Sequence, residues 1–176
     1  MRLLGYSLVL FLVGSAFSLA PETKSIRNDL NSPIALAQKV PDTGCQNVDM
    51  RELDLLDLGG KKFNLFLYFR VKELLRKSQK DGLRFTITSS YRPCKEQVEL
   101  RSANCPENDT QAESCSPPTE KPGDSLHNYG LAVDFGCDGY SVFESSPCYV
   151  WLKAHSSEFN LKQRPEEPWH WSLTGH

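Results

Sequence analysis

Residues 125–134 read SLHNYGLAVD and join a polar loop to a short apolar strand, which we predict over residues 131–135. His127 lies in the loop, and Asp134 lies inside the strand. A carboxylate in such an apolar run is costly to bury unless it is paired or bound to a metal ion. Gly130 lets the backbone turn sharply between them. From this segment alone, a His127–Asp134 ion pair and a partial metal site are equally good interpretations.

A second segment, residues 166–171, reads EEPWHW and places His170 between two tryptophans in a strand that we predict over residues 169–173. If this strand pairs with the strand of Asp134, His170 becomes a third ligand. Two nitrogens and one oxygen leave a fourth position open for water, as in catalytic zinc sites. The set therefore predicts one divalent metal ion, and zinc suits it best.

Two further side chains are candidates for chemistry. Glu167 lies three residues before His170, across Pro168, which stiffens the approach. A carboxylate there can take a proton from the attacking water; without the link to His170, Glu166 and Glu167 would be ordinary exposed charges. Arg92 follows a strand and a turn and can fork toward a substrate carboxylate or a developing oxyanion. On pattern alone, a surface role for this arginine is the simpler interpretation.

These segments resemble the zinc D-alanyl-D-alanine carboxypeptidases of the VanY type, which share a fold with the hedgehog signalling domain. The resemblance rests on Ser-x-His-x-x-Gly-x-Ala-x-Asp at 125–134, on Glu-Pro-Trp-His-Trp at 167–171, and on Ser-x-Tyr-Arg at 89–92 with Gln97 five residues later. It runs from about residue 60 to residue 173 with the motifs in order. The cysteine-containing loop 104–124 departs from the family pattern. This loop precedes Ser125 directly, so it can form one wall of a cleft and change substrate choice.

The resemblance implies a role for each matching residue: metal binding by His127, Asp134 and His170, catalysis by Glu167 and Arg92, and substrate binding by Ser125, Arg92 and Gln97. It implies zinc-dependent hydrolysis of peptidoglycan stem peptides, with D-alanyl-D-alanine carboxypeptidase action as the leading hypothesis. An endopeptidase that cuts within the stem or cross-bridge is the near alternative. A non-catalytic zinc-containing binding module is the alternative from another class, and the retained base Glu167 argues against it.

The order of the expected elements predicts an α+β fold, with flanking helices on a small, largely antiparallel sheet of the hedgehog/DD-peptidase kind. The strongest helix signal covers residues 61–80, where apolar residues recur at helical spacing and Gly82 follows as a stop. The other expected elements are a strand at 83–89, a short helix at 95–101, the loop 104–124, a strand at 131–135, a helix at 147–159 and a strand at 169–173.

The N-terminal residues 1–20 have the pattern of a signal peptide, with a short positive start, an apolar run and small residues before position 21. The run is shorter than the roughly 20 residues that a membrane span needs. We therefore expect cleavage, a flexible leader over 21–44 and a peptidase domain over 45–176. The mature protein is expected to be secreted or periplasmic, without a transmembrane span, and a monomer. A net charge of −2 gives no electrostatic case for nucleic acid.

Cysteine usage fits an exported chain, because an even number in an oxidising compartment favours disulfides. The six cysteines are Cys45, Cys94, Cys105, Cys115, Cys137 and Cys148. The sequence does not choose among their pairings. The shortest loops favour Cys105 with Cys115 and Cys137 with Cys148, leaving Cys45 with Cys94. A cysteine zinc site is disfavoured because no C-x-x-C pair occurs.

Overall fold

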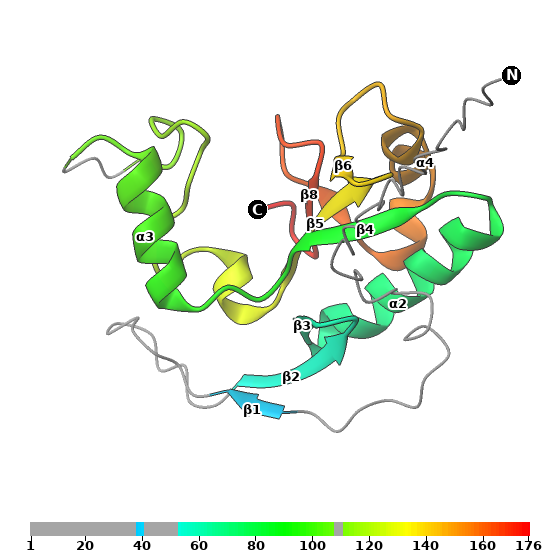
Figure 1. Cartoon of the computed structure of the whole chain (residues 1–176), viewed down its shortest axis with the longest axis horizontal. Coiled ribbons are helices and arrows are strands. Elements are labelled where there is room, and N and C mark those ends of the chain that lie inside the picture. The colour runs from blue at the N-terminus through cyan, green and yellow to red at the C-terminus, as the bar shows by residue number, and fades with distance from the viewer. Residues whose placement is uncertain (1–37, 41–52, 108–110) are drawn as a thin grey trace, which may run out of the picture.

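The computed structural model describes residues 38–40, 53–107 and 111–176 (Figure 1). Its helices are α2 (Leu65–Lys80), α3 (Cys94–Asn104) and α4 (Pro147–His155), with 3₁₀ turns η1 (Leu126–Tyr129) and η2 (Ser156–Phe159). Its strands are β1 (Gln38–Val40), β2 (Leu53–Leu58), β3 (Lys61–Asn64), β4 (Phe85–Ser89), β5 (Ala132–Cys137), β6 (Tyr140–Ser141), β7 (Lys162–Gln163) and β8 (His170–Ser172). Within these ranges no helix combines the length and the apolar character that crossing a membrane requires.

The strands form two antiparallel sheets. The smaller sheet has the order β1-β2-β3, and the larger has the order β4-β5-β8-β7, with β6 paired to β5. Figure 1 shows the larger sheet in the middle of the molecule, α2 and α4 on one side of the view, and α3 set apart on the other. The predicted α+β class with a largely antiparallel sheet is confirmed.

The predicted helix over 61–80 is wrong in its first turn, because Lys61–Asn64 forms β3 in a hairpin with β2. Gly59 and Gly60, with φ of 66° and 81°, make the hairpin turn. Phe63 is fully buried from this strand. The helix begins at Leu65, where the Asn64 side chain accepts a hydrogen bond from the Phe66 amide at 3.1 Å and caps it.

Other boundaries shift by a few residues. The predicted helix 147–159 ends at His155 and continues as η2, and the helix predicted over 95–101 extends to Cys94–Asn104. The strands predicted over 83–89, 131–135 and 169–173 are β4, β5 and β8. The hairpin β2–β3, the short strands β6 and β7, and the turn η1 were not predicted. Gln38–Val40, within the segment expected to be a leader, pairs with β2 as β1.

One face of the larger sheet builds the hydrophobic core. Val133, Phe135 and Cys137 of β5 and Trp171 of β8 pack there against α2 and α4. Because side chains alternate along a strand, Asp134 must point to the opposite face. The same alternation turns the neighbours of Trp171 in β8 toward that face. The sheet therefore separates an apolar side from a side that carries polar chemistry.

Two predicted disulfides are confirmed, Cys105–Cys115 and Cys137–Cys148. Cys94 is also disulfide-bonded. Its predicted partner Cys45 lies outside the described residues, as do the predicted signal peptide and most of the predicted leader. Within the described part, no cysteine is left with a free thiol.

Candidate active site

Asp134 and His170 face each other across the β5–β8 pairing. The two residues are register partners on adjacent antiparallel strands. Asp134 Oδ1 lies 3.1 Å from His170 Nδ1. The predicted pairing of these two strands, on which the third ligand depended, is therefore present.

His127 reaches the same point from η1. The turn ends at Gly130, which has φ of 65°. A Cβ atom there would lie 2.7 Å from the backbone nitrogen of Asn64, so both the backbone angle and the close approach require glycine. His127 Nε2 lies 3.3 Å from Asp134 Oδ1 and 3.3 Å from His170 Nδ1.

Backbone oxygens fix the tautomer that each ring adopts when it is neutral. His127 Nδ1 lies 2.7 Å from the Ser90 carbonyl oxygen, and His170 Nε2 lies 3.0 Å from the backbone oxygen of His176. An oxygen of this kind only accepts hydrogen bonds, so each of these nitrogens carries the ring proton. In a neutral imidazole the other nitrogen is then a bare acceptor. The nitrogens that face Asp134, Nε2 of His127 and Nδ1 of His170, are therefore the ones that can bind a metal ion.

Three groups that can each donate an electron pair to a metal ion therefore converge. His127 and His170 are buried, and Asp134 Oδ1 is a buried oxygen whose neighbours, although close, are not aligned to hydrogen-bond to it. Burial alone would raise the pKa of the Asp134 carboxyl, but His127 and His170 outweigh it and hold that pKa well below its usual range. The carboxyl is thus ionised. Such a cluster needs a cation, and its N₂O donor set fits zinc.

Glu167 lies beside this cluster in the turn between β7 and β8. Its Oε2 is 3.8 Å from His170 Nδ1, and burial raises the pKa of its carboxyl. Glu166, in contrast, is exposed and has φ of 64°, as a turn residue. The structure therefore brings Glu167, and not Glu166, to the metal cluster.

Arg92 is held at the cavity by two side chains. It donates from Nη1 to Gln97 Oε1 at 2.8 Å and from Nη2 to Ser89 Oγ at 3.1 Å. Gln97 is almost fully buried, and its Nε2 donates to the Glu120 carbonyl oxygen at 2.8 Å. Gln97, predicted to bind substrate, lines the cavity but has both ends of its amide engaged within the protein. Its observed contacts are those of a residue that orients Arg92.

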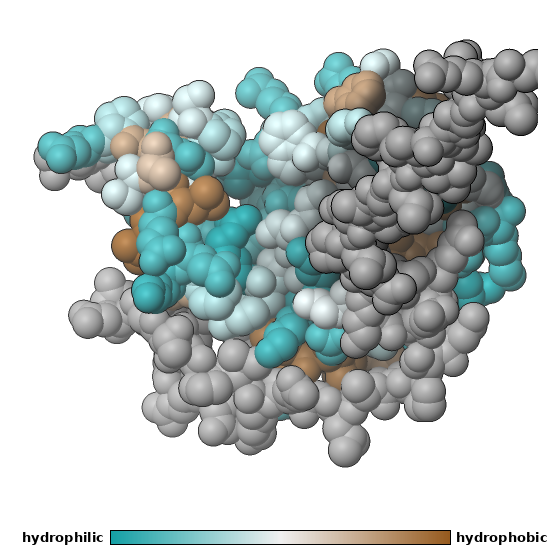
Figure 2. Space-filling model, viewed as in Figure 1, coloured by the Kyte–Doolittle hydropathy of each residue, from teal (hydrophilic) through white to brown (hydrophobic). Residues whose placement is uncertain are grey.

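These groups line one cavity of about 160 Å³. Ser125 lines it as predicted, and residues 117–120 of the cysteine-containing loop form its wall opposite the sheet. Ligand pockets usually measure about 300–1,000 Å³, so this cavity suits the end of a peptide better than a long segment. In Figure 2 hydrophilic residues dominate the surface between α3 and the sheet.

Two residues that the sequence did not indicate belong to this cavity. Arg164 Nε lies 3.1 Å from Glu167 Oε1, and Arg164 Nη2 lies 2.9 Å from Glu120 Oε1. Neither residue falls in the motifs at 125–134 or 167–171. The Arg164–Glu120 ion pair joins the turn before β8 to a loop far away in the chain. No periodicity or motif spacing in the sequence predicts such a contact.

Comparison with known proteins gives one family and a set of similar folds. The family model described as VanY, D-alanyl-D-alanine carboxypeptidase, matches residues 62–176. A VanY D,D-pentapeptidase mutant from a VanB-type vancomycin resistance cassette, solved with Zn(II), is 24% identical with a TM-score of 0.57, over 82% of this chain and 86% of that chain. VanYB with D-Alanine-D-Alanine is also 24% identical with a TM-score of 0.57, over 82% and 85% of the two chains.

The LdcB LD-carboxypeptidase is 17% identical with a TM-score of 0.51, over 80% of this chain and 67% of that chain. No curated protein matches the chain in sequence. At these identities the structural likenesses establish the fold alone, and they agree with the fold expected from the motifs.

Proposed function

Because the chain belongs to the VanY family of D-alanyl-D-alanine carboxypeptidases, we propose that it removes the terminal D-alanine from peptidoglycan stem peptides in a zinc-dependent reaction. The observation that carries the proposal is the convergence of three potential ligand atoms beside a largely buried carboxylate. His127, Asp134 and His170 hold one zinc ion. When bound, zinc supplies Lewis acidity, which polarises a carbonyl oxygen and acidifies water.

Glu167 is the general base in this proposal. Its ionised carboxylate takes a proton from the attacking water and returns it to the leaving amine. Burial raises the pKa of Glu167, which makes the carboxylate a stronger base than an exposed glutamate. Its position, with Oε2 3.8 Å from a nitrogen of the proposed ligand His170, supports this role.

Arg92 stabilises the negative charge that develops on the scissile carbonyl. A donor that is already held in place costs no reorganisation during the reaction. The hydrogen bonds to Gln97 and Ser89 supply that preorganisation. Ser125 contributes to substrate binding from the cavity lining.

The size of the cavity favours a carboxypeptidase over an endopeptidase. A chain end needs less space than a segment that continues on both sides of the cleaved bond, so the small volume of this cavity supports a carboxypeptidase. A binding module would have no use for a largely buried base next to its metal ligands, so catalysis is the better explanation of Glu167.

The proposal also includes export. The two disulfides within the described residues fit an oxidising compartment. We assign residues 1–20 as a signal peptide and the mature protein as a secreted or periplasmic monomer.

The test is hydrolysis of a stem pentapeptide by the zinc-loaded protein, with products identified by mass. Release of one D-alanine, abolished by a chelator, is expected. Glu167→Gln should lower kcat by about 10²- to 10⁴-fold, the usual contribution of general acid–base catalysis. Glu166→Gln is the matched control and should retain the wild-type rate, because that neighbour is exposed.

Other products decide between the alternatives. Internal cleavage would make the protein an endopeptidase with the same machinery. No cleavage by folded, zinc-loaded protein would contradict the proposal and favour a binding role.

A further inference from the structure

Arg164 lies between two carboxylates: that of Glu167, the proposed base, and that of Glu120 on the cavity wall. Its Nε is 3.1 Å from Glu167 Oε1, and its Nη2 is 2.9 Å from Glu120 Oε1. The Arg164 side chain is only 15% exposed, and that of Glu167 only 12%. An arginine fork held at both ends has few alternative positions, so its contacts carry geometric information.

The two oxygens of Glu167 have different neighbours. Oε1 faces Arg164, and Oε2 lies 3.8 Å from His170 Nδ1. Fixing one oxygen of a planar carboxylate sets the direction of the other. Arg164 therefore turns the free oxygen of Glu167 toward the metal cluster.

The backbone of the turn does not need the Arg164 side chain. Three hydrogen bonds close it: Arg164 N to His170 O at 3.0 Å, Glu167 N to Arg164 O at 3.2 Å, and His170 N to Glu167 O at 3.0 Å. All of them are main-chain contacts that a substitution at Arg164 leaves in place. The ion pairs of the Arg164 side chain are therefore with Glu167 and Glu120 and are separate from the hydrogen bonds that close the turn.

Glu120 connects this contact to the other proposed catalytic side chain. Its carboxylate holds Arg164, which holds Glu167, and its carbonyl oxygen accepts from Gln97, which holds Arg92. One residue of the wall thus stands at the start of two chains of contacts. Each chain ends at a residue that the proposed mechanism uses.

We propose that Arg164 and Glu120 are positioning residues for the general base. Arg164 orients the Glu167 carboxylate, and Glu120 holds Arg164. This inference rests on the proposed function for its kinetic consequence, although the orientation itself is a structural statement. Neither residue touches the metal cluster or the reacting atoms.

The test compares Arg164→Met, Arg164→Lys and Glu120→Gln in zinc-loaded protein. We expect Arg164→Met to lower kcat by about 10- to 100-fold, the scale of a misplaced catalytic group, with KM changed less than about 3-fold. Lysine keeps the charge but not the fork, so it should rescue part of the loss. Glu120→Gln leaves its backbone carbonyl intact and should cost less than Arg164→Met. Arg84→Met is the matched control, because it removes an exposed Arg84–Asp138 pair and should leave kcat unchanged.

Three further readouts separate positioning from a structural role. Zinc affinity and melting temperature should remain those of the wild type. In a Glu167→Gln background, Arg164→Met should add no further loss, because residues that act as a unit are not additive. A crystal structure of zinc-loaded Arg164→Met should show the Glu167 carboxylate turned away from His170.

Wild-type kcat in Arg164→Met, or an equal further loss without Glu167, would overturn the inference. If the wild-type protein hydrolyses no stem peptide, the proposed function fails instead. The orientation of Glu167 in the variant crystal structure then decides this inference alone.

Discussion

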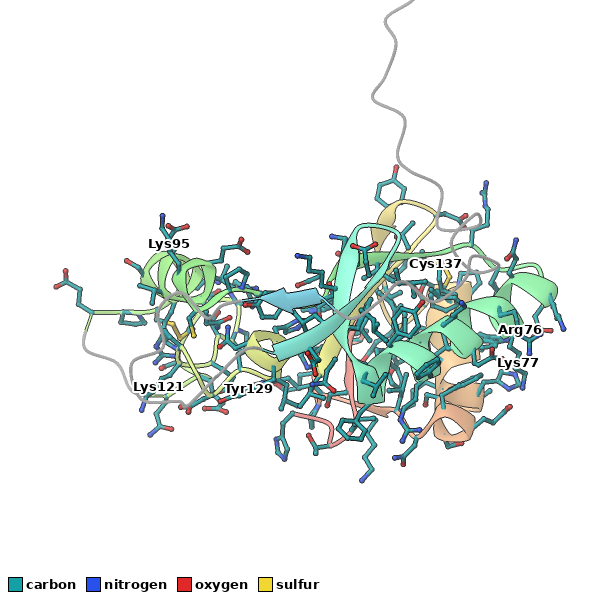
Figure 3. All side chains as sticks on the ribbon, turned by 90° about the horizontal axis from the view of Figure 1, so that it is seen from below. Arg76, Lys77, Lys95, Lys121, Tyr129 and Cys137 are labelled. Carbon is teal, nitrogen blue, oxygen red and sulfur yellow. A yellow bond between two sulfur atoms is a disulfide. The ribbon has the colours of Figure 1, made fainter. Side chains whose placement is uncertain are left out.

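The sheet and the wall of the cavity are built on different physical principles. Asp134 and His170 stand on paired strands whose opposite face is packed against the apolar core. The wall, made of α3 and the described loop residues 105–107 and 111–120, has little apolar burial; the residues that α3 buries are Cys94 and Gln97. Figure 3 shows Lys95 and Lys121 at the wall end of the molecule, and Arg76 and Lys77 at the opposite end.

Polar contacts and covalent bonds hold the wall instead. Gln97 donates to the Glu120 carbonyl, Arg101 to the Thr119 carbonyl, and Asn104 to the Thr119 hydroxyl. The Cys105–Cys115 disulfide closes the loop. The difference teaches that the placement of Asp134 and His170 depends on strand register, whereas the shape of the cavity depends on a loop that can change without disturbing that register.

The largest expected effect comes from a substitution on the sheet, at Asp134. Asp134→Asn removes a charged ligand atom from the cluster. Loss of an outer contact costs about 10- to 100-fold in metal affinity, so loss of a ligand should exceed about 100-fold and abolish hydrolysis. The zinc affinity of the variant is measured by titration in competition with a chelator.

The matched control is Asp138→Asn, an exposed carboxylate at φ of 52° that asparagine tolerates well. It should bind zinc as the wild type does. Wild-type zinc affinity in Asp134→Asn would mean that Asp134 and His127 form only an ion pair.

The pH dependence of kcat tests whether Glu120 of the wall influences the pKa of Glu167. Burial raises the pKa of Glu167 above its ordinary 4.5, against the opposing pull of His170 and Arg164. The base must be ionised, so kcat should fall about tenfold per pH unit below that raised pKa. Because the charge of Glu120 also raises this pKa, Glu120→Gln should move the acid limb to lower pH.

Rates are measured at saturating zinc, so that protonation of the ligand histidines does not mimic the limb. Glu99→Gln, on the exposed side of α3, is the control and should leave the limb in place. A kcat that stays flat down to pH 4.5 would contradict a raised Glu167 pKa.

The sheet side was largely predictable from the sequence. Asp134 lies in a strand whose alternate residues are apolar, and His170 lies between two tryptophans. In both strands, alternation therefore predicts that the polar residue faces away from the apolar side of the sheet. The helix over 61–80 was placed too early because Phe63 fits a helical spacing as well as a buried strand position. Asn64 was the missed signal, since it caps α2.

The contacts that hold the wall could not be predicted in the same way. Its residues have no period, and its contacts run from side chains to carbonyl oxygens, which every residue possesses. The contact between Glu120 and Arg164 depends on how the loop returns to the sheet. Sequence motifs therefore indicated the proposed catalytic groups but not Arg164 and Glu120, which we propose to orient one of them.

The smallest expected effect separates the two regions by their disulfides. Cys105–Cys115 and Cys137–Cys148 close loops of nearly equal length, with sequence separations of 10 and 11, so their loop-entropy contributions should be similar. Cys137 and Cys148 belong to the hydrophobic core, whereas the other pair borders the wall.

Replacing Cys105 and Cys115 by serine should raise KM by about 3- to 10-fold at unchanged zinc affinity, because the wall loosens. Replacing Cys137 and Cys148 should instead lower the melting temperature more, since two polar groups enter the core. Equal losses of melting temperature with unchanged KM in the wall variant would show that the wall does not shape the cavity.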